Sequence, residues 1–244
     1  MIVNVIQARM GSSRLPGKVL MEVNGIPLLK RMYDRVIKSV LVDKTIIATT
    51  NEQKDDAIVL FCKNQGIEHY RGSENDVLDR YYQAAKIFNP EIVVRMTADC
   101  PLADPEIIDK TIRLFINRKV DYAANTVPPE VKKFPDGSDV EVFSFLALEK
   151  AWKEATDIKD REHVTFYFWK KNNGFSTAML NNTYDWGKYR ITIDYPEDFE
   201  VISFIINELE KNRSNGSMKE IIEILDLNPR VYNKNSMYTF GMNW

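Results

Sequence analysis

The sequence has few of the residues that build disulfide frameworks or histidine-rich metal sites. Its 244 residues include two cysteines, Cys62 and Cys100, and two histidines, His69 and His163. No CxxC spacing is present, so free thiols in a reducing compartment are the simplest interpretation, and we expect no zinc site made of several histidines. No apolar run approaches the roughly 20 residues that cross a bilayer, and no signal-like segment opens the chain. We therefore expect a soluble cytoplasmic protein with no membrane partner.

An excess of charge of either sign is also absent. The chain has 33 lysines and arginines against 35 aspartates and glutamates, a net charge of −2. This balance argues against a general polyanion binder, and we expect no nucleic-acid partner. The length and the 44% of hydrophobic residues suit one large domain with an ample core, or such a domain with a small appendage.

The opening of the chain sets cations, glycines and serines directly after an apolar segment. Residues 2–8 are predicted to form a buried strand, and a short loop follows. Glycines let backbone amides approach phosphate oxygens, and cations neutralise them, so this loop predicts a polyphosphate site. The alternative is a basic surface turn with solvated charges. The residues concerned are Arg9, Gly11, Ser12, Ser13, Arg14, Gly17 and Lys18.

This loop matches neither of the two common phosphate-binding motifs. A Walker loop has four residues between its glycines and a Ser or Thr after its lysine. Here five residues separate Gly11 from Gly17, and Val19 follows Lys18. The dinucleotide pattern G-x-G-x-x-G is absent as well. The loop therefore indicates another kind of nucleotide site.

Short segments rich in Ile and Val alternate with helical patterns in the first half of the chain. We predict strands at residues 2–8, 45–49, 67–70 and 92–96, and helices at 28–40, 55–65 and 76–88. This alternation predicts an α/β fold with a mainly parallel, doubly wound sheet. Ligands of such sheets bind beyond the carboxyl ends of the strands, which is where the first loop would lie.

The second half is less regular. We predict strands at 120–124, 139–143 and 190–194, the last returning to the sheet, a loop at 127–137, and helices at 145–155, 160–171, 196–212 and 218–225. We divide the chain into a nucleotide-binding half (1–119), an inserted acceptor-binding or dimerisation region (120–185) and a return strand with C-terminal helices (186–244). The aromatic end of the chain, NKNSMYTFGMNW, has no clear periodicity.

Two aspartates follow predicted strands. Asp99 comes just after the strand at 92–96, and Asp194 ends the strand at 190–194. If both strands join the sheet, both carboxylates emerge beside the first loop. Magnesium binds one or two carboxylates together with phosphate oxygens, so we predict a Mg²⁺ site at these aspartates. The alternatives are a turn residue before Pro101 for Asp99 and a helix-start residue for Asp194.

Two further segments are weaker candidates. In RGSENDVLDRY (71–81), Arg71 and Ser73 face the base or ribose in one interpretation, and Ser73 is only a helix cap in the other. Asp79 is either part of this nucleotide site or an ordinary charge on a helix face. In DVEV (139–142) and REHVT (161–165), an acceptor pocket is one interpretation and a structural or solvated histidine is the alternative. The acceptor candidates are Asp139, Glu141, Arg161, Glu162 and His163.

Three motifs, QARMGSSRLPGKVL, TADCPL and IDYPEDFE, resemble the cytidylyltransferases of the CMP-3-deoxy-octulosonate and CMP-sialate synthetase group. The branch named for spore coat polysaccharide biosynthesis is the most similar, and the resemblance is weaker over 120–185. It implies a Rossmann-like nucleotidyltransferase fold (GT-A-like) with an inserted dimerisation region, hence a homodimer. It also implies a Mg²⁺-dependent reaction that couples CTP to a sugar hydroxyl and releases pyrophosphate.

The resemblance also implies residue roles. By motif position, Arg9, Ser13, Arg14 and Lys18 match the family's triphosphate-binding residues, Arg71 a nucleotide-contacting arginine, Asp99 and Asp194 its metal ligands, and Glu162 and His163 sugar-contacting positions. With the residue pattern described above, we predict a catalytic set of Arg14, Lys18, Asp99 and Asp194. We predict a nucleotide set of Ala8, Arg9, Gly11, Ser12, Ser13, Arg14, Lys18, Arg71, Ser73 and Asp79. Asp139 and Glu141 replace a His-Ile-Gly segment that contacts the sugar acid in the octulosonate synthetases, so the acceptor stays open. The alternatives are another nucleotidylyltransferase, a nucleotide-sugar glycosyltransferase and a non-catalytic nucleotide-binding subunit.

Overall fold

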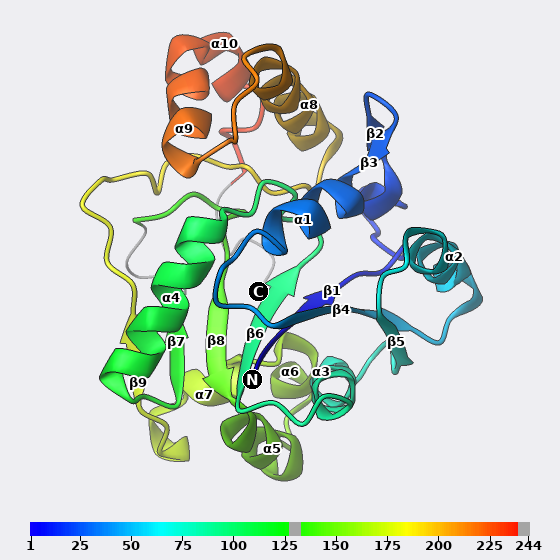
Figure 1. The fold of residues 1–244 in the computed structure, drawn as a ribbon, viewed down its shortest axis with the longest axis vertical. Helices are drawn as coiled ribbons and strands as arrows, with labels where there is room; N and C mark the ends of the chain where they lie inside the picture. The colour runs from blue at the N-terminus through cyan, green and yellow to red at the C-terminus, as the bar shows by residue number, and fades with distance from the viewer. Residues whose placement is uncertain (127–132, 239–244) are drawn as a thin grey trace.

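A seven-stranded sheet forms the centre of the computed structural model, which describes residues 1–126 and 133–238 (Figure 1). Its order is β5-β4-β1-β6-β8-β7-β9. Among the described strands of this sheet only β8 runs against its neighbours, so the predicted α/β fold with a mainly parallel sheet is confirmed. The strands are β1 (Ile2–Gln7), β4 (Lys44–Thr50), β5 (His69–Gly72), β6 (Ile92–Thr97), β7 (Tyr122–Ala124), β8 (Glu141–Ser144) and β9 (Thr177–Met179). A separate hairpin joins β2 (Glu22–Val23) to β3 (Ile26–Pro27).

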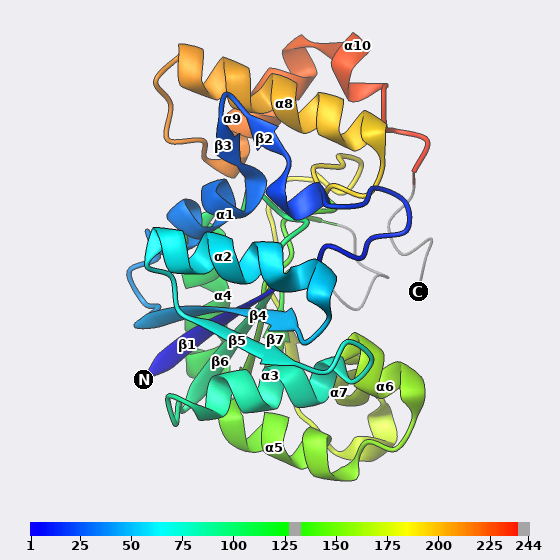
Figure 2. The same cartoon turned by 90° about the vertical axis from the view of Figure 1, so that its right-hand side faces the viewer.

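Helices cover both faces of the sheet (Figure 2). Alternate residues of each strand point to opposite faces, so Val5 enters one buried cluster and Ile6 the other. One face carries α1 (Leu28–Val36), α2 (Asp56–Gln65) and α4 (Pro105–Arg118), and beyond them α8 (Pro196–Lys211), α9 (Met218–Leu227) and α10 (Pro229–Tyr232). The other face carries α3 (Val77–Lys86), α5 (Phe145–Glu154), α6 (Ile158–His163) and α7 (Phe166–Trp169). No helix of the described residues is long and apolar enough to cross a membrane.

In the first half, the predicted strands and helices are present and differ from the structure at their ends, while α4 and the β2–β3 hairpin were not predicted. The predicted helix at 28–40 ends at Val36, because Ser39 turns the chain toward α4. Its hydroxyl donates to Asp109 Oδ1 at 2.6 Å, and the backbone N–H of Leu41 donates to the same oxygen at 3.3 Å. The helix α4 was not predicted, although Asp104 caps it and Pro105 opens it.

The predicted helix at 160–171 is wrong. The chain forms two short helices, α6 and α7, and then the 3-10 turn η3 (Lys171–Asn173). The break falls at Val164, whose φ of 61° and ψ of −60° form a tight turn closed by the Thr165 N–H and the His163 carbonyl. Val164 is fully buried, so the packing of its side chain outweighs the strain of this backbone.

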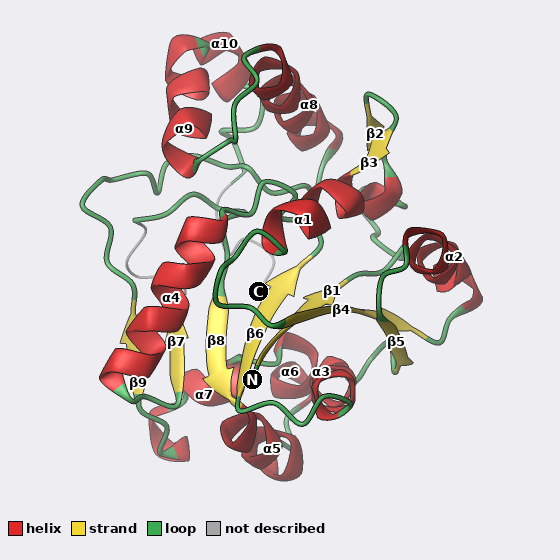
Figure 3. Cartoon of the chain, in the orientation of Figure 1, coloured by secondary structure: helices red, strands yellow, loops and turns green. Residues whose placement is uncertain are grey.

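The predicted strand at 190–194 is also wrong. Figure 3 draws the chain before α8 as a loop, and Arg190 forms one isolated bridge with Asp136. The segment is nevertheless held, because the N–H groups of Ile191 and Ile193 donate to the carbonyls of Asp136 and Asp99. Gly137 makes this approach possible: its φ is 97°, and a Cβ there would overlap the backbone nitrogen of Thr192.

The strands of the region 120–185 extend the same sheet as the first half. Part of the predicted loop at 127–137 and the last residues of the aromatic end lie outside the described residues. The division of the chain into three parts stays a prediction.

Candidate active site

The first loop and Asp99 lie beyond the carboxyl ends of two neighbouring strands. β1 ends at Gln7 and β6 at Thr97, and the N–H of Ala98 donates to the Gln7 carbonyl at 2.9 Å. After β1 the loop folds back on itself, since the N–H groups of Ser12 and Gly17 both donate to the Met10 carbonyl at 3.0 Å. Ala8 is buried, and its N–H donates to the Ala48 carbonyl of β4. The loop is therefore anchored to the sheet at its root.

Lys18 is the point on which both predicted aspartates converge. Its Nζ lies 3.0 Å from Asp194 Oδ1, 3.3 Å from Asp99 Oδ2 and 2.6 Å from the Ile193 carbonyl oxygen. Burial alone would lower the pKa of Lys18, but the two carboxylates outweigh it and the pKa is raised. Likewise, burial would raise the pKa of Asp99, whereas the Lys18 ammonium holds it below its ordinary value. Three predicted side chains thus form one charged cluster.

Arg14 adds a second cation to Asp194. Its Nη2 donates to Asp194 Oδ1 at 2.8 Å, and its guanidinium lies 5.2 Å from the ring centre of Tyr195. The pKa of Arg14 is raised, because its bond to Asp194 outweighs the effect of burial. Arg14 and Lys18 therefore both donate to the same oxygen, Oδ1 of Asp194.

The start of α8 fixes the position of Asp194. Pro196 takes the first helical position, and the Asp198 carboxylate accepts the N–H groups of Asp194 and Tyr195 at 2.9 and 3.0 Å. The same carboxylate accepts Nε and Nη2 of Arg190 at 2.8 and 2.9 Å. Arg190 also donates to Asp194 Oδ2 at 3.3 Å. Sequence reasoning missed Arg190 and Asp198, although an acid in the first turn after Asp-x-Pro indicates such a cap.

Two more aspartates lie near this cluster. Asp136 pairs with Arg190, yet burial and the neighbouring carboxylates, Asp139 first, raise its pKa to about 7. Asp139 accepts the Thr126 hydroxyl at 2.6 Å and the Gly137 N–H at 3.0 Å, and its pKa is raised mainly by burial. The predicted acceptor residue Asp139 is thus brought close to the site, with Cys100 between it and Asp99.

The opposite side of the first loop contacts the chain after β4 and β5. Lys54 lies 2.6 Å from Glu74, Arg9 lies 3.9 Å from the same carboxylate, and a Cβ on Gly11 would lie 2.7 Å from Lys54 Nζ. Buried Asp55 accepts the Met10 N–H at 2.6 Å. Sequence reasoning missed these partners, because no motif links residues 54, 55 and 74 to the loop.

The remaining nucleotide candidates have structural partners. Ser12 Oγ accepts the Leu15 N–H at 3.4 Å, and Ser13 is exposed. Arg71 binds the carbonyls of Thr50 and Glu52 and the Asp56 carboxylate, so it ties β5 to the chain after β4.

Ser73 precedes α3, and Asp79 lies in its first turn. Ser73 Oγ accepts the Asp76 N–H at 3.0 Å and so closes the turn before α3. It is not the helix cap considered above, because the N-cap of α3 is Asp76, whose carboxylate accepts the Asp79 N–H at 2.9 Å. Asp79 accepts the indole N–H of Trp152 at 2.8 Å, so its carboxylate is directed to α5 rather than to Lys18.

The other acceptor candidates are spread over the opposite face of the sheet. Glu141 is 3% exposed and binds Arg95 and the Tyr122 hydroxyl. Arg161 ties α6 to α3 through Asp76, at 2.7 and 2.8 Å. Glu162 is exposed. His163 stacks on Phe166 at 4.3 Å, and burial lowers its pKa. The structure therefore does not bring these four to the Lys18 cluster.

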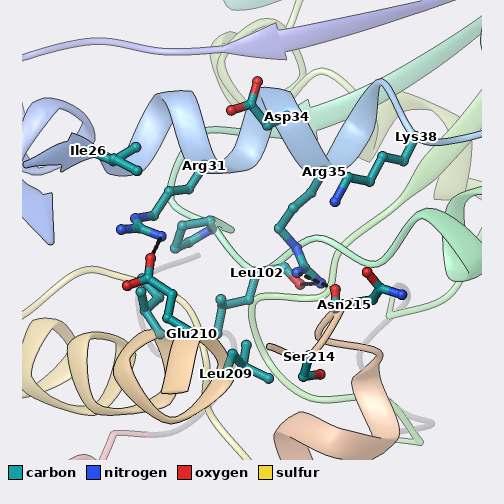
Figure 4. A pocket seen from close by; sticks show the side chains of 12 residues that line it. Ile26, Arg31, Asp34, Arg35, Lys38, Leu102, Leu209, Glu210, Ser214 and Asn215 are labelled. Carbon is teal, nitrogen blue, oxygen red and sulfur yellow. Dashed lines mark hydrogen bonds and ion pairs between the residues drawn. The ribbon is translucent and has the colours of Figure 1, made fainter. Parts of the chain in front are cut away.

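A separate pocket lies between α1 and α8 (Figure 4). Its volume is about 190 Å³, and Arg31, Arg35 and Glu210 are among its lining residues. Arg31 donates to the Val23 carbonyl and pairs with Glu210, while Arg35 donates to the carbonyls of Ala103 and Gly216. Both arginines are bound to backbone carbonyls of neighbouring segments, so they join these segments and are not part of the cluster around Lys18.

The donor set around Lys18 fits a cation that is bound together with phosphates. No group of three or more His, Cys, Asp or Glu side chains that could hold a metal ion occurs within residues 1–126 and 133–238. The carboxylates of Asp99 and Asp194 lie close together, since both bind Lys18 Nζ. Mg²⁺ in nucleotide enzymes is bound by one or two carboxylates together with phosphate oxygens and water. The residues present therefore suit Mg²⁺ only when a polyphosphate completes its shell.

Comparison with known proteins shows what the chain is similar to. A family model described as cytidylyltransferase matches residues 3–221. The spore coat polysaccharide biosynthesis protein SpsF of Bacillus subtilis is 33% identical, over 93% of this chain and 95% of that protein. A 3-deoxy-manno-octulosonate cytidylyltransferase of Pelobacter propionicus is 36% identical over 46% of this chain and 43% of that protein. The solved structure of a cytidylyltransferase from Leptospira borgpetersenii superimposes with a TM-score of 0.89 at 33% identity, covering 97% and 98% of the two chains.

Proposed function

Since the chain belongs to the cytidylyltransferase family, we propose that it transfers CMP from CTP to a hydroxyl of a sugar or sugar acid and releases pyrophosphate. The observation that carries the proposal is the convergence of Asp99 and Asp194 on Lys18, with Arg14 on the same carboxylate. A basic surface turn with solvated charges would not place the largely buried Lys18 ammonium between two half-buried carboxylates.

The side chains of this cluster have distinct tasks in the reaction. The acceptor oxygen attacks the α-phosphorus of CTP, and the bond from this phosphorus to the β-phosphate oxygen breaks. Arg14 and Lys18 neutralise the phosphates and stabilise the charge that grows on the leaving pyrophosphate. Asp99 and Asp194 would hold Mg²⁺, which when bound polarises the α-phosphate and eases deprotonation of the incoming hydroxyl. Arg190 and Asp198 keep Asp194 in place.

The relatives support the choice of acceptor class. SpsF is named for spore coat polysaccharide biosynthesis, and the Pelobacter protein is named for 3-deoxy-manno-octulosonate. We therefore include in the proposal a sugar or sugar-acid acceptor destined for a surface polysaccharide or glycoconjugate. Asp139 is the one acceptor candidate near the cluster, so it is the side chain expected to contact the acceptor.

The test is a pyrophosphate-release screen. Four nucleoside triphosphates are combined with sugar acids, amino sugars and phosphorylated polyols, with Mg²⁺ present or chelated. We expect release only with CTP, only with an acceptor and only with Mg²⁺. Release with another nucleotide in preference to CTP would overturn the nucleotide assignment. Binding of CTP without release for any acceptor would favour a non-catalytic subunit, and transfer from a nucleotide sugar would favour a glycosyltransferase.

The proposal includes a cytoplasmic location and a homodimer. Cys62 and Cys100 are both buried free thiols, which suits a reducing compartment. We place the subunit contact in the region 120–185, where Leu146 and Ile158 are 76% and 80% exposed. Light scattering after size exclusion should give twice the chain mass of 28.3 kDa. A single-chain mass at micromolar concentration would refute the dimer.

A further inference from the structure

We propose that residues 233–238, the segment after α10, position Asp194 and Arg14 for the reaction. This inference rests on the proposed function. The segment opens the aromatic end of the chain, whose pattern predicts no role, and it lies against the start of α8. Two of its side chains reach the partners of the catalytic residues, one by hydrogen bonds and the other by stacking.

Asn235 contacts the groups that hold Asp194. Its side chain is 1% exposed, and its Nδ2 donates to Asp198 Oδ1 at 2.9 Å and to the Arg190 carbonyl at 3.2 Å. Asp198 thus accepts donors from both sides, since Arg190 and the N–H of Asp194 bind the same carboxylate. The Asn235 amide fixes the rotation of that carboxylate, and through it the Asp194 backbone.

Tyr238 contacts Arg14 indirectly, through the ring of Tyr195. Its ring stacks on Tyr195 with 3.9 Å between ring centres and 4° between planes, and its hydroxyl donates to Glu197 Oε2 at 3.1 Å. Arg14 lies over the Tyr195 ring, so the stack fixes the surface on which the Arg14 guanidinium rests. Arg190 lies 5.6 Å from the Tyr238 ring centre. Arg14 and Arg190, the two arginines that bind Asp194, therefore each lie over a ring of the Tyr195–Tyr238 pair.

The contacts differ from ordinary packing of a chain end. An apolar anchor would bury Leu or Phe in a hydrophobic cluster, whereas Asn235 is a buried amide directed at a buried carboxylate. An amide in this place adds specificity of orientation, because its hydrogen bonds are lost if Asp198 rotates. Loss of the segment should therefore change the geometry at Asp194 more than it changes the core.

The experiment compares variants of the full chain in pyrophosphate release. Asn235→Ala should lower kcat/KM for CTP about 10- to 100-fold, the range typical of residues that orient metal ligands. It should also raise the Mg²⁺ concentration needed for half-maximal rate. Tyr238→Leu should lower kcat/KM about 5- to 20-fold, and Tyr238→Phe, which keeps the stack, should restore most of this loss.

Lys234→Ala is the matched control. It lies in the same segment and removes an exposed ion pair with Glu200, away from Asp198, so its kcat/KM should stay within about twofold of wild type. All rates are measured at least about 15 °C below the lowest melting temperature, which separates activity from unfolding.

Hydrogen exchange is the second readout and needs no activity. In Asn235→Ala the amides of residues 194 and 195 should exchange faster, with those of β6 unchanged. Wild-type rates, Mg²⁺ requirement and exchange in both Asn235→Ala and Tyr238→Leu would overturn the inference while leaving the proposed function intact. Absence of pyrophosphate release by the wild-type protein would instead count against the proposed function, and exchange alone would then decide on the segment.

Discussion

At the scale of single residues, the site contains charged side chains that meet at Lys18 and buried side chains, Asp198 among them, that hold the first group in place. Lys18, Asp99 and Asp194 belong to motifs that combine charge with glycines, prolines and strand ends, so their meeting was predictable. Asp198, Arg190 and Asn235 hold those residues by side-chain hydrogen bonds that depend on the tertiary fold. No local pattern distinguishes a buried supporting arginine such as Arg190 from an exposed one.

Replacement of Asp194 tests the proposed catalytic cluster directly. Asp194→Asn keeps the size of the side chain but removes the charge that binds Lys18 and Arg14. We expect turnover to fall about 10²- to 10³-fold, with a change in melting temperature of no more than about 3 °C. Pyrophosphate release and thermal unfolding followed by circular dichroism give both values. Turnover close to wild type would remove Asp194 from the catalytic set.

Asp136 should make stability depend on pH. Its pKa is raised to about 7 in the folded protein, from an ordinary value of 3.8, because burial and Asp139 disfavour its charge. The folded state therefore binds this proton more tightly, so its stabilising contribution is complete below about pH 4 and is lost as the pH rises to about 7.

We expect Asp136→Asn to show a smaller decrease in the free energy of unfolding from pH 4.5 to 7.5 than wild type, by about 1 kcal/mol or more. Urea unfolding at several pH values measures this slope. Asp185→Asn, at an exposed aspartate, is the control and should keep the wild-type slope. An unchanged slope in Asp136→Asn would contradict the raised pKa.

At the scale of elements, local periodicity predicted the first half well because its strands and helices are regular and well buried. It failed where tertiary contacts override the local pattern. The segment 190–194 has the alternating residues of a strand, yet its partners are two loops. The stretch 160–171 was predicted to be one helix, yet buried Val164 turns the chain. Neither partner is visible in a window of a few residues.

Gly137 tests how the segment 190–194 is held. Alanine at this position needs a φ of 97° and would overlap the backbone of Thr192, so the two loops must separate. We expect Gly137→Ala to lower the free energy of unfolding by about 3 kcal/mol or more and to reduce turnover. Gly66→Ala is matched, because its φ is also positive but nothing lies within 4 Å of its Cβ. That variant should lose about 1 to 2 kcal/mol and retain turnover. Equal losses in urea unfolding would show that the close approach has no special role.

At the scale of the whole molecule, strand–helix alternation predicted the α/β class but not the order of the sheet. The strand β8, which runs against both of its described neighbours in the seven-stranded sheet, pairs with β6 on one side and β7 on the other. Its position between strands that are distant in sequence is set by long-range pairing, which composition and periodicity do not encode. The same limit applies to the site, since β8 carries Glu141 to Arg95 rather than to Lys18.

Binding of nucleotide with metal should stabilise the whole fold. A ligand at a hundred times its Kd adds about 2.7 kcal/mol, which corresponds to a rise in melting temperature of about 5 to 10 °C for a chain of this size. We expect CTP with Mg²⁺ to give this rise, and CTP with a chelator to give less than half of it. In Asp99→Asn the two conditions should give the same small rise. Equal rises in wild type with and without Mg²⁺ would argue against a metal between Asp99 and Asp194.

The ammonium of Lys18 has a consequence for the order in which ligands arrive. It already acts as an internal counter-ion for both carboxylates, and a divalent ion that comes alone must compete with it. A divalent ion that arrives with a polyphosphate also brings phosphate oxygens. The Lys18 ammonium can bind these oxygens when the ion takes its place at the two carboxylates, so every charge keeps a partner. The enzyme should therefore bind the metal ion together with the nucleotide, and it should bind divalent ions weakly when no nucleotide is present.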